Sequence, residues 1–161
     1  MNGTATGLYR ALAALTYVMP LTSALRAGGP FLSFLADQAP AVLNVFQLLL
    51  LPLPPFILIE SNPILGLGVF IVLFAFVVLN TNISRFIRFN VLQAILVSFM
   101  ISIGSLIVGV LGLSGIFAET LLNVLFLGGM AVVVYSVVQS IAGRYAEIPT
   151  ISEAVNMQMP Y

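Results

Sequence analysis

Long uncharged apolar runs dominate this chain, and four of them are long enough to cross a membrane as helices. They cover residues 8–27, 63–79, 85–113 and 120–142. Pro20 lies near the middle of the first run, where it removes a backbone donor and predicts a kink or an end to the first half-helix. The pattern therefore predicts an all-α fold, in one membrane domain, with four transmembrane helices.

A fifth apolar run, residues 41–59, is harder to place. Its length alone would allow it to span, but three prolines break its centre: Pro52, Pro54 and Pro55. Its first half sets apolar side chains around Asn44 and Gln47, a pattern typical of a helix that lies at the membrane interface. We expect this segment to be interfacial or re-entrant.

Composition supports a membrane protein. Hydrophobic residues make up 61% of the chain, charged residues only 6%, and the mean hydropathy is +1.18. A soluble domain would carry about a quarter charged residues. The net charge is zero, so there is no basic surface to attract nucleic acid.

Several residue types are missing altogether: Cys, His, Lys and Trp. Their absence excludes disulfides, iron–sulfur clusters, thiolate zinc sites, imidazole bases and Schiff-base lysines. We therefore expect no metal and no cofactor.

Orientation follows from the arginines. If residues 41–59 stay outside the four spans, four of the five arginines fall on one side of the membrane: Arg10, Arg85, Arg88 and Arg144. Arg26 falls on the other side. The positive-inside rule then places both termini, including the tail at residues 143–161, in the cytoplasm or its organellar equivalent.

The start of the third span carries the most unusual polarity. Arg85 and Arg88 lie one helical turn apart beside two phenylalanines, which is typical of an interfacial anchor; a docking or gating ring at a pore is the alternative. Asn90 and Gln93 follow within the apolar run. An unpaired amide is costly in lipid, so both should face protein or water.

Small residues form a stripe along the same span at spacings of three and four: Ser98, Ser102, Ser105, Gly109 and Gly112. Such stripes let helices approach closely. Packing within the chain is the favoured interpretation, and a seam between copies or a lumen wall is the alternative. Asn123 in the fourth span and Tyr17 in the first are isolated polar groups that should each make one interhelical hydrogen bond.

The acidic residues offer little chemistry. Asp37, Glu60 and Glu119 are expected in loops or at helix ends, which leaves no carboxylate within a span for a proton relay. No nucleophile–base pair, paired carboxylates or cluster of metal ligands can be assembled, so we expect no enzymatic activity.

Two motifs suggest a family. They are Arg88–Ala94, which reads RFNVLQA, and the tail Glu147–Ala154, which reads EIPTISEA. With the Tyr9–Leu21 segment and the proline-broken run, they make nearly the whole chain resemble the twenty-kilodalton Tic subunit family of the chloroplast inner-envelope protein-import translocon and its cyanobacterial relatives. The resemblance implies four transmembrane helices with both termini stromal or cytoplasmic.

The same resemblance implies a channel-type subunit for protein transport. The lack of a transit peptide and of Lys and Cys points to a cyanobacterial member, in the plasma or thylakoid membrane, with the plastid inner envelope as the alternative. The implied partners are membrane lipid and other membrane subunits, with another copy of the chain and a translocating polypeptide as further candidates. Two alternatives stay open: a structural or assembly subunit of a larger, for example photosynthetic, membrane complex, and a small-solute channel.

Overall fold

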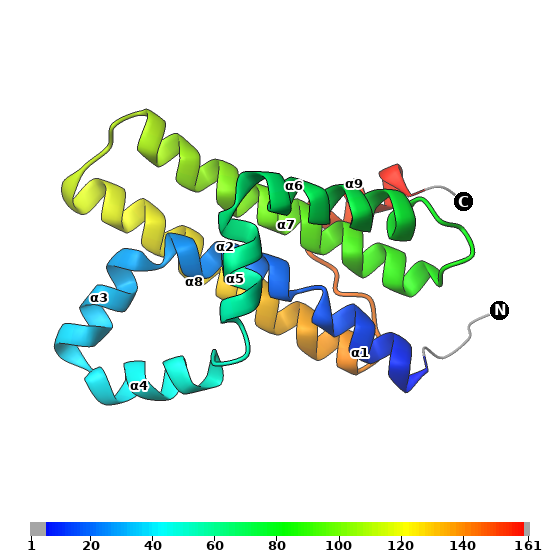
Figure 1. The fold of residues 1–161 in the computed structure, drawn as a ribbon, viewed down its shortest axis with the longest axis horizontal. Helices are drawn as coiled ribbons and strands as arrows, with labels where there is room; N and C mark the ends of the chain where they lie inside the picture. The colour runs from blue at the N-terminus through cyan, green and yellow to red at the C-terminus, as the bar shows by residue number, and fades with distance from the viewer. Residues whose placement is uncertain (1–5, 160–161) are drawn as a thin grey trace.

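The computed structural model describes residues 6–159, and every regular element in that range is a helix (Figure 1). The longest two, α7 (Arg85–Val110) and α8 (Gly115–Ile141), form an antiparallel hairpin. Gly112 and Gly115 make its turn with φ of 62° and 64°, a region that glycine enters without strain. Both helices are long and apolar enough to cross a membrane. The prediction of an all-helical fold is therefore confirmed for the described residues.

The first predicted span consists of two helices, α1 (Gly7–Leu15) and α2 (Val18–Ala27). They meet at Thr16 and Tyr17, and Thr16 lies four residues before Pro20. A proline ring clashes with the carbonyl at that distance, which explains why the helix breaks there. The expected kink is thus confirmed. Both halves pack against α7 and α8, so α1 and α2 together form the third helical segment of the bundle and run along the hairpin.

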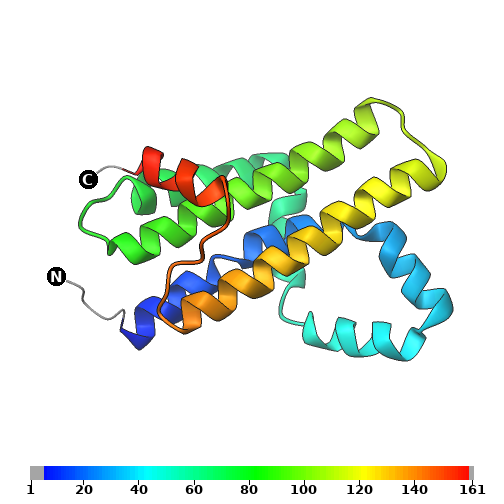
Figure 2. The same cartoon turned by 180° about the vertical axis from the view of Figure 1, so that it is seen from behind.

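The proline-broken run also forms two helices, α4 (Pro40–Leu49) and α5 (Pro54–Ser61), bent by 83°. Taken together, α4 and α5 are long and apolar enough to form one broken membrane span or a re-entrant loop. A further helix, α3 (Gly29–Gln38), was not among the predicted elements. Together α3, α4 and α5 make an open arc beside the bundle (Figures 1 and 2).

The second predicted span is the shorter helix α6 (Pro63–Val72), which continues as a π-helix, η1 (Leu73–Val78), and lies along α7. Helix α9 (Ile151–Gln158), which was also not predicted, packs on α7. The chain enters α1 and leaves α9 at the same end of the bundle (Figures 1 and 2). We call this the terminal end.

The interior is apolar and tight where α2 crosses α7 and α8. Ala24 and Ala27 of α2 pack there with Ile101 of α7 and Phe126 of α8. A Cβ built on Gly129 of α8 would lie 2.8 Å from Ile101 Cδ1 and 3.0 Å from Ala24 Cβ. The crossing therefore depends on a residue without a side chain at this point.

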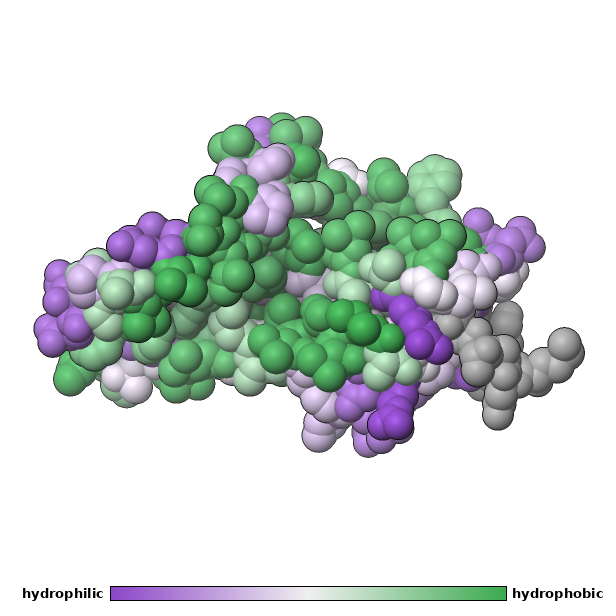
Figure 3. Space-filling view, turned by 90° about the horizontal axis from the view of Figure 1, so that it is seen from below, coloured by the Kyte–Doolittle hydropathy of each residue, from purple (hydrophilic) through white to green (hydrophobic). Residues whose placement is uncertain are grey.

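Much of the outer surface is apolar as well, as the face drawn in Figure 3 shows. Ile64, Val110 and Ile116, for example, are 80%, 76% and 83% exposed. A soluble monomer rarely shows so much contiguous apolar surface, whereas a membrane protein turns such surface toward lipid.

Alanine at Gly129 should weaken the α2–α8 crossing. We expect Gly129→Ala to lower the free energy of unfolding by about 1–3 kcal/mol, the usual cost of overpacking. Gly128 is the matched control, because a Cβ there meets nothing within 4 Å and the change should be neutral or stabilising through helix propensity. Thermal unfolding of the two detergent-solubilised variants gives the comparison. Equal stability of the two would contradict the packing described here.

Candidate functional site

The arginine pair at the start of α7 contacts two different elements. Arg88 is buried, only 4% exposed, and its Nε donates to the Val78 carbonyl at 2.8 Å. Val78 ends η1, where backbone carbonyls run out of helical partners, so the guanidinium caps that helix. Arg85 is exposed and donates from Nη2 to Asn156 Oδ1 of α9 at 3.3 Å.

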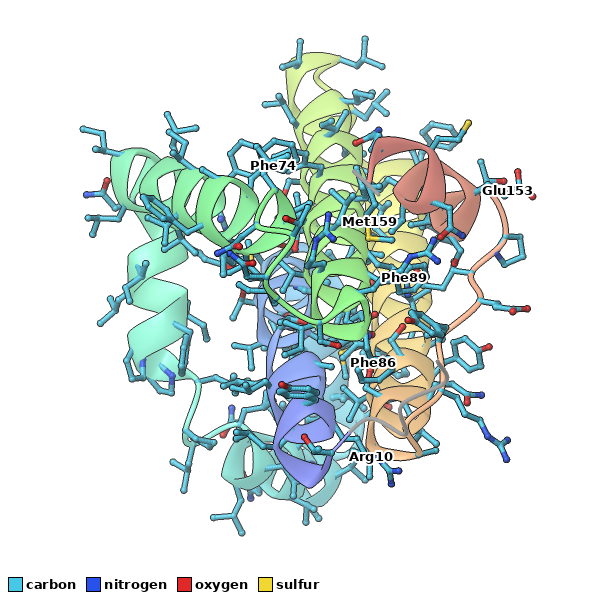
Figure 4. The ribbon with its side chains drawn as sticks, turned by 90° about the vertical axis from the view of Figure 1, so that its right-hand side faces the viewer. Arg10, Phe74, Phe86, Phe89, Glu153 and Met159 are labelled. Carbon is cyan, nitrogen blue, oxygen red and sulfur yellow. The ribbon has the colours of Figure 1, made fainter. Side chains whose placement is uncertain are left out.

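Two aromatic contacts fix the chain as it leaves α8. Phe86 and Phe89, on successive turns of α7, both meet the Tyr145 ring edge-on, with ring centroids 5.4 and 4.9 Å apart (Figure 4). Edge-to-face pairs of this kind add about 0.5–1.5 kcal/mol to the burial of the rings. They hold residues 143–150 against the terminal end of α7.

Asn90 lies at the centre of the same end and is fully buried. Its Oδ1 accepts hydrogen bonds from Tyr17 Oη at 3.0 Å and from Ser140 Oγ at 2.9 Å, and its Nδ2 donates to the Phe86 carbonyl at 2.8 Å. A single amide thus joins the α1–α2 junction, α7 and α8.

Gln93, one turn further and also fully buried, extends the chain of bonds to α9. Its Nε2 donates to Tyr17 Oη at 3.0 Å, and its Oε1 accepts from Ser152 Oγ at 2.9 Å. Ser152 Oγ also lies 3.1 Å from the Ala146 carbonyl and accepts from the Ile148 N–H at 2.7 Å. Ser152 therefore fastens α9 and the segment before it to the bundle.

We refer to the connected side chains as the amide network: Tyr17, Asn90, Gln93, Ser140 and Ser152. Hydroxyls and amides in this arrangement can hold helices together in an apolar interior. They offer neither an acid–base pair nor an activated nucleophile. Within residues 6–159, no three Asp, Glu, His or Cys side chains gather as a metal site would need.

The remaining candidate residues lie outside the network. Ser98 Oγ and Asn123 Oδ1 are buried with no hydrogen-bond partner within the described part of the chain. The bond expected for Asn123 is therefore missing there, whereas Tyr17 makes two bonds in place of the one predicted.

The small-residue stripe packs within the chain only at its start. Ser98 is buried and Ser105 half-buried, but three of its members are exposed: Ser102, Gly109 and Gly112. Burial within the chain therefore supports close packing only for Ser98 and Ser105, and the role of the other three stays a prediction. The close approach of α7 to α8 is made by Gly104 instead, where a built Cβ would lie 2.9 Å from Leu125 Cδ2.

A cavity of about 660 Å³ lies beside the network, between α1, α5, α6–η1 and α7. We call it the lateral groove. Its walls are mostly apolar, and Glu60 of α5 lines it. Glu60 lies near a helix end as expected, but its carboxylate accepts a hydrogen bond from Thr22 of α2, a contact that the sequence did not reveal.

Comparison with known proteins identifies the family. The profile described as "Chloroplast import apparatus Tic20-like" matches residues 5–155. A Tic20 family protein of Synechocystis sp. is 45% identical over 99% of this chain and 98% of its own length. The Tic20 family protein Ycf60 of Gracilaria tenuistipitata var. liui is 32% identical, over 90% of this chain and 72% of its own. Protein TIC 20-II, chloroplastic, of Arabidopsis thaliana is 29% identical, over 93% and 72%.

The chain belongs to the Tic20 family. The resemblance found in the sequence is therefore confirmed, and the 45% identity to a Synechocystis protein agrees with a cyanobacterial member. The two motifs that suggested the family also contact each other, since Gln93 of the first bonds Ser152 of the second. In this Tic20 family member they build one structural unit, the amide network.

The network should make Asn90 far less replaceable than Asn123. Asn90→Leu removes the acceptor of the Tyr17 and Ser140 hydroxyls, and leaving these buried donors unpaired should cost about 1–3 kcal/mol of unfolding free energy. Asn123→Leu removes an oxygen that has no partner among the described residues and should be neutral or stabilising. Thermal unfolding in detergent measures both, and a larger loss in Asn123→Leu would refute the network.

Ser152 should control the docking of α9. Ser152→Ala removes the acceptor of the Ile148 N–H and the donor to Gln93, so amides of residues 146–158 should exchange hydrogen faster. Glu153→Gln, at an exposed neighbour labelled in Figure 4, is the control and should leave exchange unchanged. Hydrogen exchange followed by mass spectrometry makes the test. Unchanged exchange in Ser152→Ala would show that this side chain does not hold the helix.

Proposed function

We propose that this chain is a membrane subunit of an assembly that moves polypeptides across or into a cyanobacterial membrane. The observation that carries the proposal is the family match over nearly the whole chain, including a chloroplast import apparatus profile. The Synechocystis relative, matched over 99% of this chain and 98% of its own length, supports the same assignment.

The placement of polar groups favours a subunit over a pore made by one chain. A pore made by one chain would require polar side chains such as Asn90 and Gln93 to face a polar lumen. In the structure both amides are buried and bonded to other side chains of the bundle, and the lateral groove beside them is apolar. A polar path for a polypeptide would therefore need surfaces from other membrane subunits or further copies, which are the partners that we propose.

We also propose a four-span topology with both termini cytoplasmic. The spans would be α1–α2, α6–η1, α7 and α8, with α3, α4 and α5 at the opposite side or re-entrant. Support comes from the common end at which the chain enters α1 and leaves α9, and from the arginines near that end: Arg10, Arg85, Arg88 and Arg144.

Single cysteines can test this topology, because the chain has no Cys of its own. Glu153→Cys should react with a membrane-impermeant maleimide only from the cytoplasmic face, and Glu119→Cys, near the hairpin turn, only from the other face. Right-side-out and inverted vesicles provide the two exposures. Labelling of both cysteines from one face would contradict the topology.

The transport role is tested by capturing a polypeptide in transit. A precursor fused to a tightly folded domain is stalled in native membranes, and the tagged chain is purified in mild detergent with a photoreactive residue at Leu12 of α1. We expect the precursor to co-purify and to crosslink to the chain. Co-purification with an energy-converting complex and no precursor would instead favour the structural-subunit alternative.

A further inference from the structure

Two hydrogen bonds join α5 to α2, and Glu60 takes part in both. Helix α5 packs on α2 and α6 and forms one side of the lateral groove, where Phe56 and Ile59 belong to the wall. In Figure 4, α5 and α6 stand on one side of α1. The Glu60 carboxyl contacts the Thr22 hydroxyl, and Arg26 Nη1 donates to the Glu60 backbone carbonyl at 3.3 Å. The chemical state of Glu60 therefore bears on whether α5 stays against α2.

The Thr22 hydroxyl has two oxygen neighbours but only one proton. Thr22 Oγ1 lies 2.7 Å from the Met19 carbonyl oxygen and within hydrogen-bonding distance of Glu60 Oε2. A hydroxyl donates one hydrogen bond, and neither a carbonyl nor an ionised carboxylate has a proton to give. An ionised Glu60 therefore competes with the Met19 carbonyl for the Thr22 proton. A protonated Glu60 ends this competition, because its own O–H donates to Thr22 Oγ1 while Thr22 donates to Met19.

The surroundings of Glu60 favour the protonated form. Its side chain is half-buried beside a groove with mostly apolar walls. Removal from water disfavours the charged carboxylate, so burial raises the pKa of Glu60 above its ordinary value. The hydrogen bond from Thr22 and the positive charge of Arg26 lower this pKa but do not cancel the effect of burial. Thr22 is itself fully buried, so its hydroxyl depends on partners within the protein.

Few other ionisable groups face this carboxyl. On α2 the charged neighbour is Arg26, and α6 has no ionisable side chain. Across the groove, α1 contributes the Tyr9 phenol, whereas α7 contributes the apolar Ile87 and Val91. Among the described residues that line the groove, Glu60 carries the only carboxyl group.

We propose that Glu60 is a proton-binding site whose protonation holds α5 against α2. With the proton bound, the carboxyl donates to Thr22 and α5 closes its side of the lateral groove. When the proton leaves to water, the new negative charge is better solvated away from the apolar walls, so α5 separates from α2 and the groove widens.

The sign of the pH dependence follows from this difference in proton affinity. The docked state binds the proton more tightly than the separated state, in which the carboxyl is hydrated. Docking is therefore complete at acidic pH and is lost as the pH rises through the raised pKa of Glu60. This equilibrium concerns α5 and the groove, and it does not depend on the proposed function.

Infrared spectroscopy of the full chain, in a detergent without carbonyl groups, tests the proton. A protonated carboxyl has a carbonyl stretching band that an ionised carboxylate lacks. We expect Glu60→Gln to remove one such band, and this band should persist in the unmodified chain to a higher pH than that of a glutamate in a peptide, which titrates near about 4.3. Glu119→Gln, which removes an exposed carboxyl of α8, is the control and should leave the band and its titration unchanged.

A distance measurement in the same detergent tests the movement. Spin labels are attached through Leu58→Cys of α5 and Leu106→Cys of α7, two positions that are 72% and 63% exposed. We expect one distance population at acidic pH and a second, shifted population that grows with the same midpoint as the infrared band.

Two variants separate the proton from general effects on α5. Glu60→Gln keeps a donor to Thr22 and cannot ionise, so the doubly labelled chain should show the first population alone at every pH. Thr22→Val removes the partner of the acid and should bring the second population to acidic pH. Thermal unfolding confirms that each variant is folded, and if Thr22→Val does not fold, the comparison with Glu60→Gln still decides.

A Glu60 band that disappears in the range of a peptide glutamate would overturn the proposal. So would a distance distribution that is independent of pH, or one whose pH dependence survives Glu60→Gln. These results are distinguishable from failure of the proposed function, because neither measurement involves a precursor or a partner subunit.

Discussion

The need to hydrogen-bond two buried amides organises the terminal end of this protein. Asn90 and Gln93 lie in an apolar helix with no exposed surface, where unpaired amide groups would each cost several kcal/mol. Their partners come from the α1–α2 junction, from α8 and from α9. Satisfying these two side chains therefore brings together elements that are distant in the sequence.

The break after α1 serves this requirement. Pro20 prevents a continuous helix, and the interruption places Tyr17, fully buried, between the two amides. The phenol accepts from Gln93 and donates to Asn90, so a single oxygen links both. Arg88 links a further pair of elements, because its guanidinium on α7 caps the end of η1. Polar groups thus determine which helices meet, while the small residues at Gly104 and Gly129 determine how closely they pack.

The use of polar groups inside the bundle also determines which surfaces this chain presents to other molecules. At the terminal end the amides hold the bundle together, while the lateral groove beside them has mostly apolar walls and its one carboxyl group is hydrogen-bonded to Thr22. A Tic20 family chain whose polar groups are used inside the bundle presents mainly apolar side chains to its neighbours in the membrane. The exposed apolar side chains of α7 and α8 offer the area on which such neighbours, or lipid, would lie.

The sequence by itself determined the helical class, both long helices, the break near Pro20 and the bend at the central prolines, because apolar length and proline chemistry are local properties. It also determined the family, through two motifs. Only the tertiary structure decided that those motifs touch, that Ser152 and Ser140 belong to one network with Tyr17, and that Glu60 meets Thr22. The tertiary structure also showed α3 and α9, two helices that are too short to be recognised in the sequence beside the long apolar runs. The physical reason is that a hydroxyl or carboxylate looks the same in sequence whether it faces water or a partner, and its partner is chosen only when helices pack.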